Sequence, residues 1–185
     1  MMKIKSLEGI ENNIQHCHKC ERSNTRLHAV AGKGDIHPTL FLLGEAPGEQ
    51  DNKTGSPFSG ETGIYLNHML KLYGLQRETR YTTSILKCWA PGEIKRRHLQ
   101  ACYIWTFKQI MTVNPHWVVV MGRNAEIGMW GKVMNKKLPF IHHWRGYPCV
   151  VTCHPKSAVQ FKEQDIIFQQ GLKLIRGKIV LPEIG

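Results

Sequence analysis

The sequence lacks any long hydrophobic run, and this absence narrows the class of protein. No stretch approaches the ~18 consecutive apolar residues that a membrane-spanning helix requires. The opening residues, MMKIKSLEGIENN, lack the apolar core of a signal peptide, so we expect an intracellular, cytoplasmic protein. A GxGxxG phosphate loop, an internal repeat and a low-complexity tract are also absent. The 185 residues suit one domain that spans residues 1–185.

Acidic side chains are few in comparison with basic ones. The 14 Asp and Glu residues are outnumbered by 25 Lys and Arg, which gives a formal net charge of +11. So basic a chain favours a polyanionic partner such as a nucleic acid, although charge alone does not establish one. Five Trp, six Phe and five Tyr provide flat side chains for stacking on bases, but most aromatic residues simply fill cores.

Six cysteines are many for an intracellular chain, where metal or redox chemistry is more common than disulfides. Two of them form a C-x2-C pair whose spacing lets both thiolates reach one metal. Four thiolates suit either zinc or a [4Fe–4S] cluster, and spacing alone does not separate these. The candidate ligands are Cys17, Cys20, Cys88 and Cys102. Cys149 and Cys153 lie on or after an apolar run and are expected to be small buried hydrophobes.

Apolar runs alternate with segments of helical periodicity, which indicates an α/β domain with a largely parallel sheet. We expect strands at residues 39–43, 80–86, 117–121 and 147–152, and helices at 4–16, 61–73, 99–111 and 158–174. An acidic, Gly- and Pro-rich loop at residues 44–60 follows the first strand, and Phe58 within it is available to stack on a flat ring. Sheets of this class bind ligands beyond the carboxyl ends of their strands, although a merely solvated turn fits the composition equally well.

Four motifs occur in a distinctive order. They are GEAPGEQD with GSPFSG at residues 44–60, TSILKCWAP at 83–91, GRNA at 122–125 and HPKS at 154–157. Together with the cysteine spacing, they resemble the uracil-DNA glycosylase superfamily, and specifically its iron–sulfur family 4. The resemblance implies a three-layer α/β/α fold with a central, mostly parallel four-stranded sheet. It also implies a monomer in which the four candidate cysteines hold a structural [4Fe–4S] cluster, with zinc as the alternative.

The same resemblance implies a monofunctional DNA glycosylase, an enzyme that flips uracil or a related pyrimidine out of DNA and hydrolyses its N-glycosidic bond. The sugar becomes positively charged and the leaving base negatively charged, so acids and a hydrogen-bond donor are both useful. Glu45 and Asp51 match the acidic positions, and His154 matches the donor that faces the base. The base pocket would comprise Ala46, Phe58 and Ser84, with Phe58 stacking on the flipped base.

This sequence departs from the family at the base-reading position. The family has Asn there, whose amide both donates and accepts, whereas this chain has the shorter Ser84. Either uracil is excised weakly, or the pocket has opened for another, bulkier modified pyrimidine. Asp51 also replaces a family Glu, and Ala90 replaces a Pro.

Basic residues near the motifs are candidates for DNA contacts. They are Lys95, Arg96 and Arg97 in an expected loop, and Lys156 with Ser157 beside the last motif. His98 resembles the His of one superfamily branch that bonds covalently to uracil DNA, so a non-catalytic protein that traps a base is one alternative. A zinc-stapled nucleic-acid module without a base pocket is another.

Overall fold

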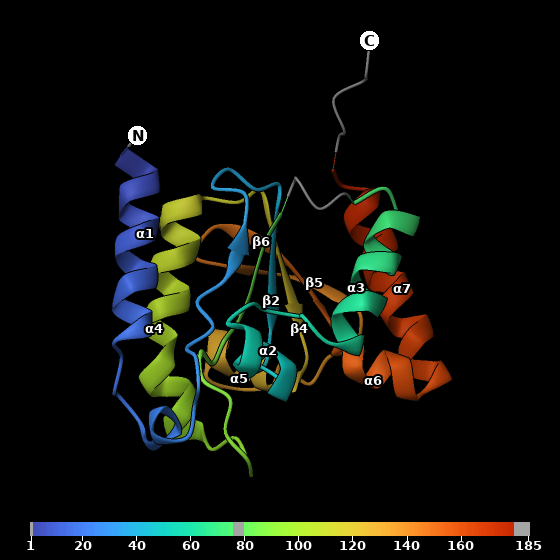
Figure 1. The fold of residues 1–185 in the computed structure, drawn as a ribbon. Coiled ribbons are helices and arrows are strands. Elements are labelled where there is room, and N and C mark those ends of the chain that lie inside the picture. The colour runs from blue at the N-terminus through green and yellow to red at the C-terminus, as the bar shows by residue number, and fades with distance from the viewer. Residues whose placement is uncertain (1, 76–79, 180–185) are drawn as a thin grey trace.

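The computed structural model describes residues 2–75 and 80–179 (Figure 1). The helices are α1 (Met2–Gln15), α2 (Glu49–Thr54), α3 (Glu61–Leu72), α4 (Arg96–Val113), α5 (Arg123–Trp130), α6 (Pro155–Gln160) and α7 (Lys162–Arg176), with a 3₁₀ turn at Glu21–Asn24. The strands are β1 (Lys33–Gly34), β2 (Leu40–Gly44), β3 (Arg80–Ser84), β4 (Trp117–Met121), β5 (Phe140–Trp144) and β6 (Tyr147–Thr152). None of the helices in these ranges is long and apolar enough to cross a membrane.

The strands form one sheet in the order β1-β3-β2-β4-β6-β5. Its four inner strands pair in parallel, while β1 and β5 pair antiparallel at the edges. The α/β prediction is therefore confirmed, but the sheet has six strands rather than four. The sequence did not reveal β1 because two residues carry no periodicity. The polar β5 was assigned to a loop, yet it forms a hairpin with β6 through Arg145 and Gly146, both at positive φ.

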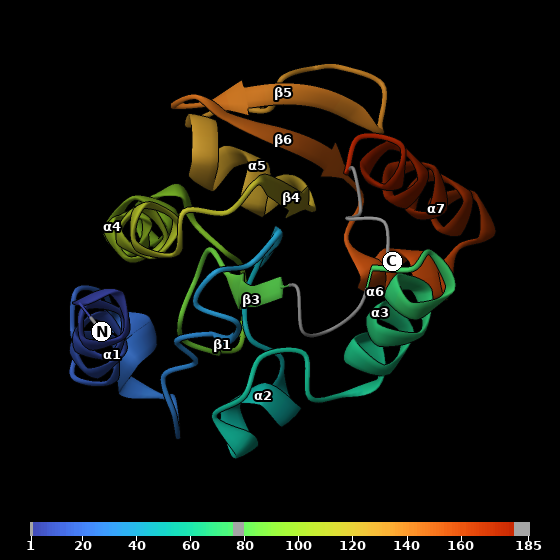
Figure 2. The ribbon, with the colours of Figure 1, turned by 90° about the horizontal axis from the view of Figure 1, so that it is seen from above.

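The sheet separates two layers of helices (Figures 1 and 2). Phe41 and Leu43 pack with α1, α4 and α5, whereas Leu40 and Leu42 pack with α3, α6 and α7. All four side chains are fully buried, because a central parallel strand is covered on both faces. This explains why the strands read as continuous apolar runs. The architecture is three-layered, as expected.

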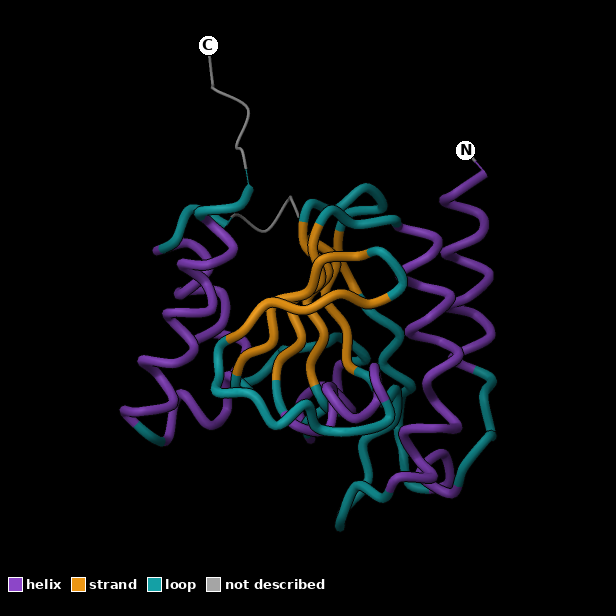
Figure 3. The backbone as a smooth tube through the Cα atoms, turned by 180° about the vertical axis from the view of Figure 1, so that it is seen from behind, coloured by secondary structure: helices purple, strands orange, loops and turns teal. Residues whose placement is uncertain are grey.

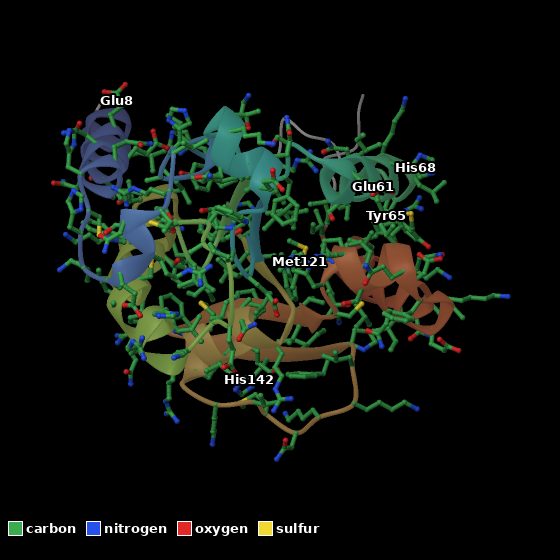
Figure 4. All side chains as sticks on the ribbon, turned by 60° about the horizontal axis from the view of Figure 1, so that its bottom comes forward. Glu8, Glu61, Tyr65, His68, Met121 and His142 are labelled. Atoms are coloured by element: carbon green, nitrogen blue, oxygen red, sulfur yellow. The ribbon has the colours of Figure 1, made fainter. Side chains whose placement is uncertain are left out.

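The helices on the second face are tied together by polar contacts as well as by packing. The Tyr65 hydroxyl on α3 donates to Asp165 Oδ1 on α7 at 2.5 Å, and Figure 4 places Tyr65 on the side of α3 that faces the C-terminal helices. The final helix expected from the sequence is in fact two helices, α6 and α7, with Phe161 in extended conformation between them. α6 thereby lies beside α3 and close to the end of β6.

The carboxyl ends of the four inner strands lie together at one end of the sheet, where the strands in Figure 3 run into loops. Each sequence motif begins at or near one of these ends: Gly44 ends β2, Ser84 ends β3, Gly122 follows β4, and His154 comes two residues after β6. The fold therefore brings the four motifs, which are far apart in sequence, to the same end of the sheet.

Two helical glycines offer a test of this packing. A Cβ at Gly128 on α5 would lie 2.3 Å from Ile85 Cγ1, and Ile85 is fully buried. We expect Gly128→Ala to lower the free energy of unfolding by about 1–3 kcal/mol through overpacking. Gly9→Ala on α1 is the control, since no described heavy atom lies within 4 Å of its added Cβ. It should stabilise by roughly 0.5–1 kcal/mol. Chemical denaturation measures both; equal effects would contradict the close approach of α5 to Ile85.

Candidate active site

Glu45 follows β2 and is held by the start of α5. Its Oε1 accepts a hydrogen bond from the Asn124 backbone N–H at 2.8 Å, and its Oε2 accepts one from Asn124 Nδ2 at 3.3 Å. Gly122 allows this contact, because any Cβ there would lie 2.5 Å from Glu45 Oε1, and its φ is +98°. The carboxylate is thus oriented by backbone and side-chain donors at a helix N-terminus, where negative charge is favoured.

Asp51 braces the acidic loop from within. Its Oδ2 accepts from the Gly48 backbone N–H at 3.0 Å, and its Oδ1 accepts from Ser59 N and Oγ at 2.7 and 2.8 Å. The residue is buried. Since both carboxylate oxygens are engaged, Asp51 ties the two arms of the loop together.

Phe58 sits where three segments approach closely. A Cβ on Gly44 would lie 2.7 Å from Phe58 Cζ and 3.3 Å from Ser84 Oγ, and a Cβ on Gly63 would lie 1.7 Å from the Phe58 carbonyl oxygen. Phe58 itself has a φ of +52°, which residues other than glycine rarely adopt. The ring therefore lies over the ends of β2 and β3, and Ser84 is only 3% exposed beneath it.

His154 caps the N-terminus of α6. Its Nδ1 accepts a hydrogen bond from the Lys156 backbone N–H at 3.1 Å, so the proton of the neutral ring resides on Nε2. Burial lowers the pKa of His154, and the nearby Glu45 carboxylate opposes that shift in part. The ring lies nearly parallel to that of Phe58, with centroids 6.0 Å apart and an interplanar angle of 21°. The site thus holds a neutral imidazole with one N–H to donate.

These side chains surround a cleft of about 520 Å³. A second cavity of about 440 Å³ shares the walls formed by Glu45 and His154. Of the residues proposed from the sequence, the cleft is lined by Glu45, Ala46, Asp51, Phe58, His154 and Lys156, and the second cavity by Ser157. Ser84 is buried and lines neither cavity.

Sequence reasoning missed two contributors to this site. Arg22 lines the cleft and donates to the carbonyl oxygens of Cys88 and Ala90 at 3.3 and 3.0 Å. Lys87 Nζ is buried on the opposite face of β3 and donates to the Ser84 carbonyl oxygen at 2.6 Å. No local pattern predicts the contacts of Arg22, whose backbone partners lie 66 and 68 residues away, although Arg22 does follow the C-x2-C pair closely.

The basic segment at residues 95–98 begins α4 and does not form the expected loop. Arg96 donates to the Gly131 carbonyl oxygen at 2.9 Å, and Arg97 pairs with Glu21. His98 is 3% exposed; its Nδ1 accepts from Lys95 N at 3.1 Å, and its Nε2 bonds Glu21 Oε1 at 2.8 Å. None of these residues lines the cleft. Arg97 and His98 join the start of α4 to Glu21 in the N-terminal segment, whereas Arg96 joins it to the end of α5.

The four candidate cysteine ligands lie at a shared, partly buried position. Arg26 Nη1 donates to Cys88 Sγ at 3.0 Å, and Trp105 Nε1 donates to Cys17 Sγ at 3.3 Å. Burial raises the pKa of the Cys88 thiol, and it raises that of Cys102 to about 12. Cys88 interacts electrostatically with Cys17 and Cys20, and Cys102 interacts with Cys20 and Cys88. The four cysteines therefore lie near one another.

The surroundings of these cysteines suit thiolates that bind a metal, because Arg26 and Trp105 donate N–H groups to two of the sulfur atoms. N–H groups aimed at sulfur are the contacts that stabilise and tune cluster-bound thiolates. Across residues 2–75 and 80–179, no three Cys, His, Asp or Glu side chains are grouped as one metal ion requires. Each thiolate of a [4Fe–4S] cluster binds a different iron atom, so its ligands are spaced more widely than those around a single ion.

The bracing role of Asp51 is testable. Asp51→Ala removes the acceptor of two backbone N–H groups and one hydroxyl, and we expect it to cost about 1–3 kcal/mol of unfolding free energy. Denaturant titration of the variant beside Glu49→Ala, an exposed acid on the same helix, measures the difference. Unchanged stability in Asp51→Ala would mean that the carboxylate does not hold the loop.

Comparison with known proteins agrees with this arrangement. The family model described as "Uracil DNA glycosylase superfamily" matches residues 31–174. The type-4 uracil-DNA glycosylase of Saccharolobus solfataricus is 30% identical over 170 residues, which cover 84% of this chain and 78% of that protein. The type-4 uracil-DNA glycosylase of Sulfurisphaera tokodaii is 30% identical over 194 residues, covering 97% and 88%. That of Archaeoglobus fulgidus is 33% identical over 124 residues, covering 66% and 62%. The chain belongs to the uracil-DNA glycosylase superfamily.

Proposed function

We propose that the protein is a monofunctional DNA glycosylase that extrudes uracil or a related pyrimidine from DNA and hydrolyses its N-glycosidic bond, leaving an abasic site. The observation that carries this proposal is the single cleft walled by an oriented carboxylate, a neutral imidazole and an aromatic ring. Relatives that match most of the chain are named type-4 uracil-DNA glycosylases.

His154 would act on the leaving base, and Glu45 would act on the sugar and the attacking water. As the bond between C1′ and the base nitrogen breaks, its electron pair leaves with the base, and His154 Nε2–H donates to the base carbonyl oxygen that takes up this charge. Glu45 stabilises the positive charge on the sugar and orients the water that attacks C1′. Phe58 stacks on the extruded base, and Ala46 leaves the neighbouring wall open. Asp51 acts through the shape of the loop.

DNA would reach this cleft along its basic rim. Lys156 lines the cleft, while Arg123, Lys136 and Ser157 line the adjoining cavity, so the flanking phosphates would be held there. Lys95, Arg96 and Arg97 lie outside the cleft and would contact only DNA that extends beyond it. The covalent-trapping alternative gains no support, because His98 is buried and both of its ring nitrogens are bonded.

Cys17, Cys20, Cys88 and Cys102 would hold a [4Fe–4S] cluster with a structural role. When bound, the cluster would cross-link the N-terminal segment to the loop after β3 and to α4. Arg22 extends that link to the cleft wall through Ala90. Zinc on the same thiolates is the alternative ligation.

Replacement of His154 tests the catalytic proposal. We expect His154→Ala to slow base release from uracil-containing DNA about 10²–10³-fold, as the loss of one preorganised donor does. Because burial holds the pKa of His154 below its ordinary value of 6.5, the wild-type rate should stay level as pH falls through 6.5 and drop only below it. Single-turnover release across pH measures both. A rate that already halves at pH 6.5 or above would contradict a lowered pKa of His154.

Replacement of a cysteine tests the metal proposal. Cys102→Ser should remove bound iron, abolish visible absorption and lower the melting temperature, because the cross-link is lost. Cys149→Ser is the matched control, since Cys149 is equally buried but lies on β6 away from the other four. Elemental analysis of both variants decides the point. Zinc in place of iron in the wild type would favour the alternative, and full iron in Cys102→Ser would exclude Cys102 as a ligand.

A further inference from the structure

Arg22 is a buried cation in the wall of the cleft, and its donors are only partly used. The residue is 5% exposed, and two of its five N–H groups donate to the carbonyl oxygens of Cys88 and Ala90 at 3.3 and 3.0 Å. Within residues 2–75 and 80–179, Nη1 makes no hydrogen bond and no carboxylate pairs with the guanidinium. Nη1 is not closed off from solvent and Arg22 lines the cleft, so an anion in the cleft can reach it. Because a buried charge without an anionic partner is costly, the guanidinium points to such a ligand.

The candidate cluster ligands have other cations beside them. Arg26 Nη1 donates to Cys88 Sγ at 3.0 Å, and the charge of Lys87 opposes the rise in the pKa of the Cys102 thiol. Arg22, by contrast, donates to backbone carbonyl oxygens rather than to sulfur. Its remaining donors are therefore left for a ligand in the cleft.

Four acids line the cleft, and each has a stabilising partner other than Arg22. The start of α5 holds one, the acidic loop holds one, Lys53 pairs with one at 2.7 Å, and the N-terminus of α3 carries the last. They are Glu45, Asp51, Glu49 and Glu61. The basic residues that line the cleft are Arg22 and Lys156. The cleft thus offers phosphate groups two cations, which come from different segments of the chain.

Trp89 lies between the two carbonyl groups that Arg22 holds, so Arg22 fixes the backbone on both sides of the indole. All five tryptophans lie in the described ranges. Four of them pack in one of the two hydrophobic clusters, whereas Trp89 belongs to neither cluster and lines the cleft. A half-buried indole that is not part of the core offers a face on which a nucleobase can stack.

We propose that Arg22 and Trp89 form a subsite for the nucleotide next to the extruded one in the same DNA strand. The guanidinium binds the phosphate that joins the two nucleotides, and the indole stacks on the neighbouring base. This inference rests on the proposed glycosylase function. Lys156 remains for the phosphate on the other side of the extruded nucleotide. Because the neighbouring base must leave its own stack to reach Trp89, single-stranded DNA shows the contact most clearly.

Removal of the neighbouring base tests the stacking contact with the wild-type protein alone. Uracil release would be measured in single turnovers over a range of protein concentrations, on single-stranded DNA with an abasic tetrahydrofuran spacer on the 5′ or the 3′ side of the uracil. We expect one of the two spacers to raise the half-saturating protein concentration about tenfold, because it lacks the base that stacks on Trp89. If neither spacer weakens binding while uracil is still released, the subsite is overturned and the glycosylase function stands. Absence of release from every DNA would overturn both.

Trp89→Ala shows whether the lost contact is with that base. On DNA with all bases present, the variant should need about tenfold more protein for half-saturation. On the DNA whose spacer weakens wild-type binding, the variant should match the wild type, because the contact is already absent. A variant that loses the same factor on both DNAs would place the stacking of Trp89 elsewhere, such as on the extruded base, and would overturn the subsite.

Arg22→Gln tests the phosphate contact through its salt dependence. Loss of one phosphate contact on a single strand should reduce the slope of log K against log salt concentration by about 0.7. Arg22→Lys keeps the charge and should restore the slope. Arg176→Gln at the end of α7 is the control, because Arg176 is exposed and lines neither cavity. An unchanged slope in Arg22→Gln would overturn the role of Arg22, and the spacer comparison decides the subsite if this variant folds poorly.

Discussion

Parallel pairing of the four inner strands is the constraint on which the site depends. Because these strands run in one direction, their carboxyl ends lie at the same end of the sheet. Residues as distant in sequence as Glu45 and His154 therefore line one cleft. Burial of both faces of the sheet fixes the strand register, since a slip by one residue would exchange the side chains of the two faces. The hydrophobic core therefore sets the geometry of the polar site.

Within that frame, the site is held mainly by backbone donors. Glu45 is oriented by the start of α5, Asp51 by two backbone N–H groups of its own loop, and His154 by the start of α6. Such donors do not rearrange during a reaction, which is what preorganised stabilisation of charge requires. Gly44 and Gly122 matter for the same reason, because a Cβ at either position would displace Phe58 or Glu45. The sequence motifs are rich in glycine where the site is crowded.

The sequence predicted the α/β class, the four inner strands and the order of the motifs, because these follow from apolar runs and residue spacing. It did not predict β1 and β5, which are too short or too polar to stand out. It also misplaced the basic segment at 95–98, whose side chains pair with Glu21 and Gly131 at the start of α4. The burial of Ser84 beneath Phe58 depends on close approaches at Gly44 and Gly63 that only coordinates reveal. Local pattern thus predicts elements, whereas long-range packing decides which side chains are accessible.

The most direct test of glycosylase activity is the product analysis of a single turnover on DNA that contains one uracil or one modified pyrimidine. We expect free base and abasic DNA in equal amounts, with no protein–DNA adduct that survives denaturation. If no base is released from any of these DNAs, or if the protein remains covalently attached to DNA, the protein is not a monofunctional glycosylase.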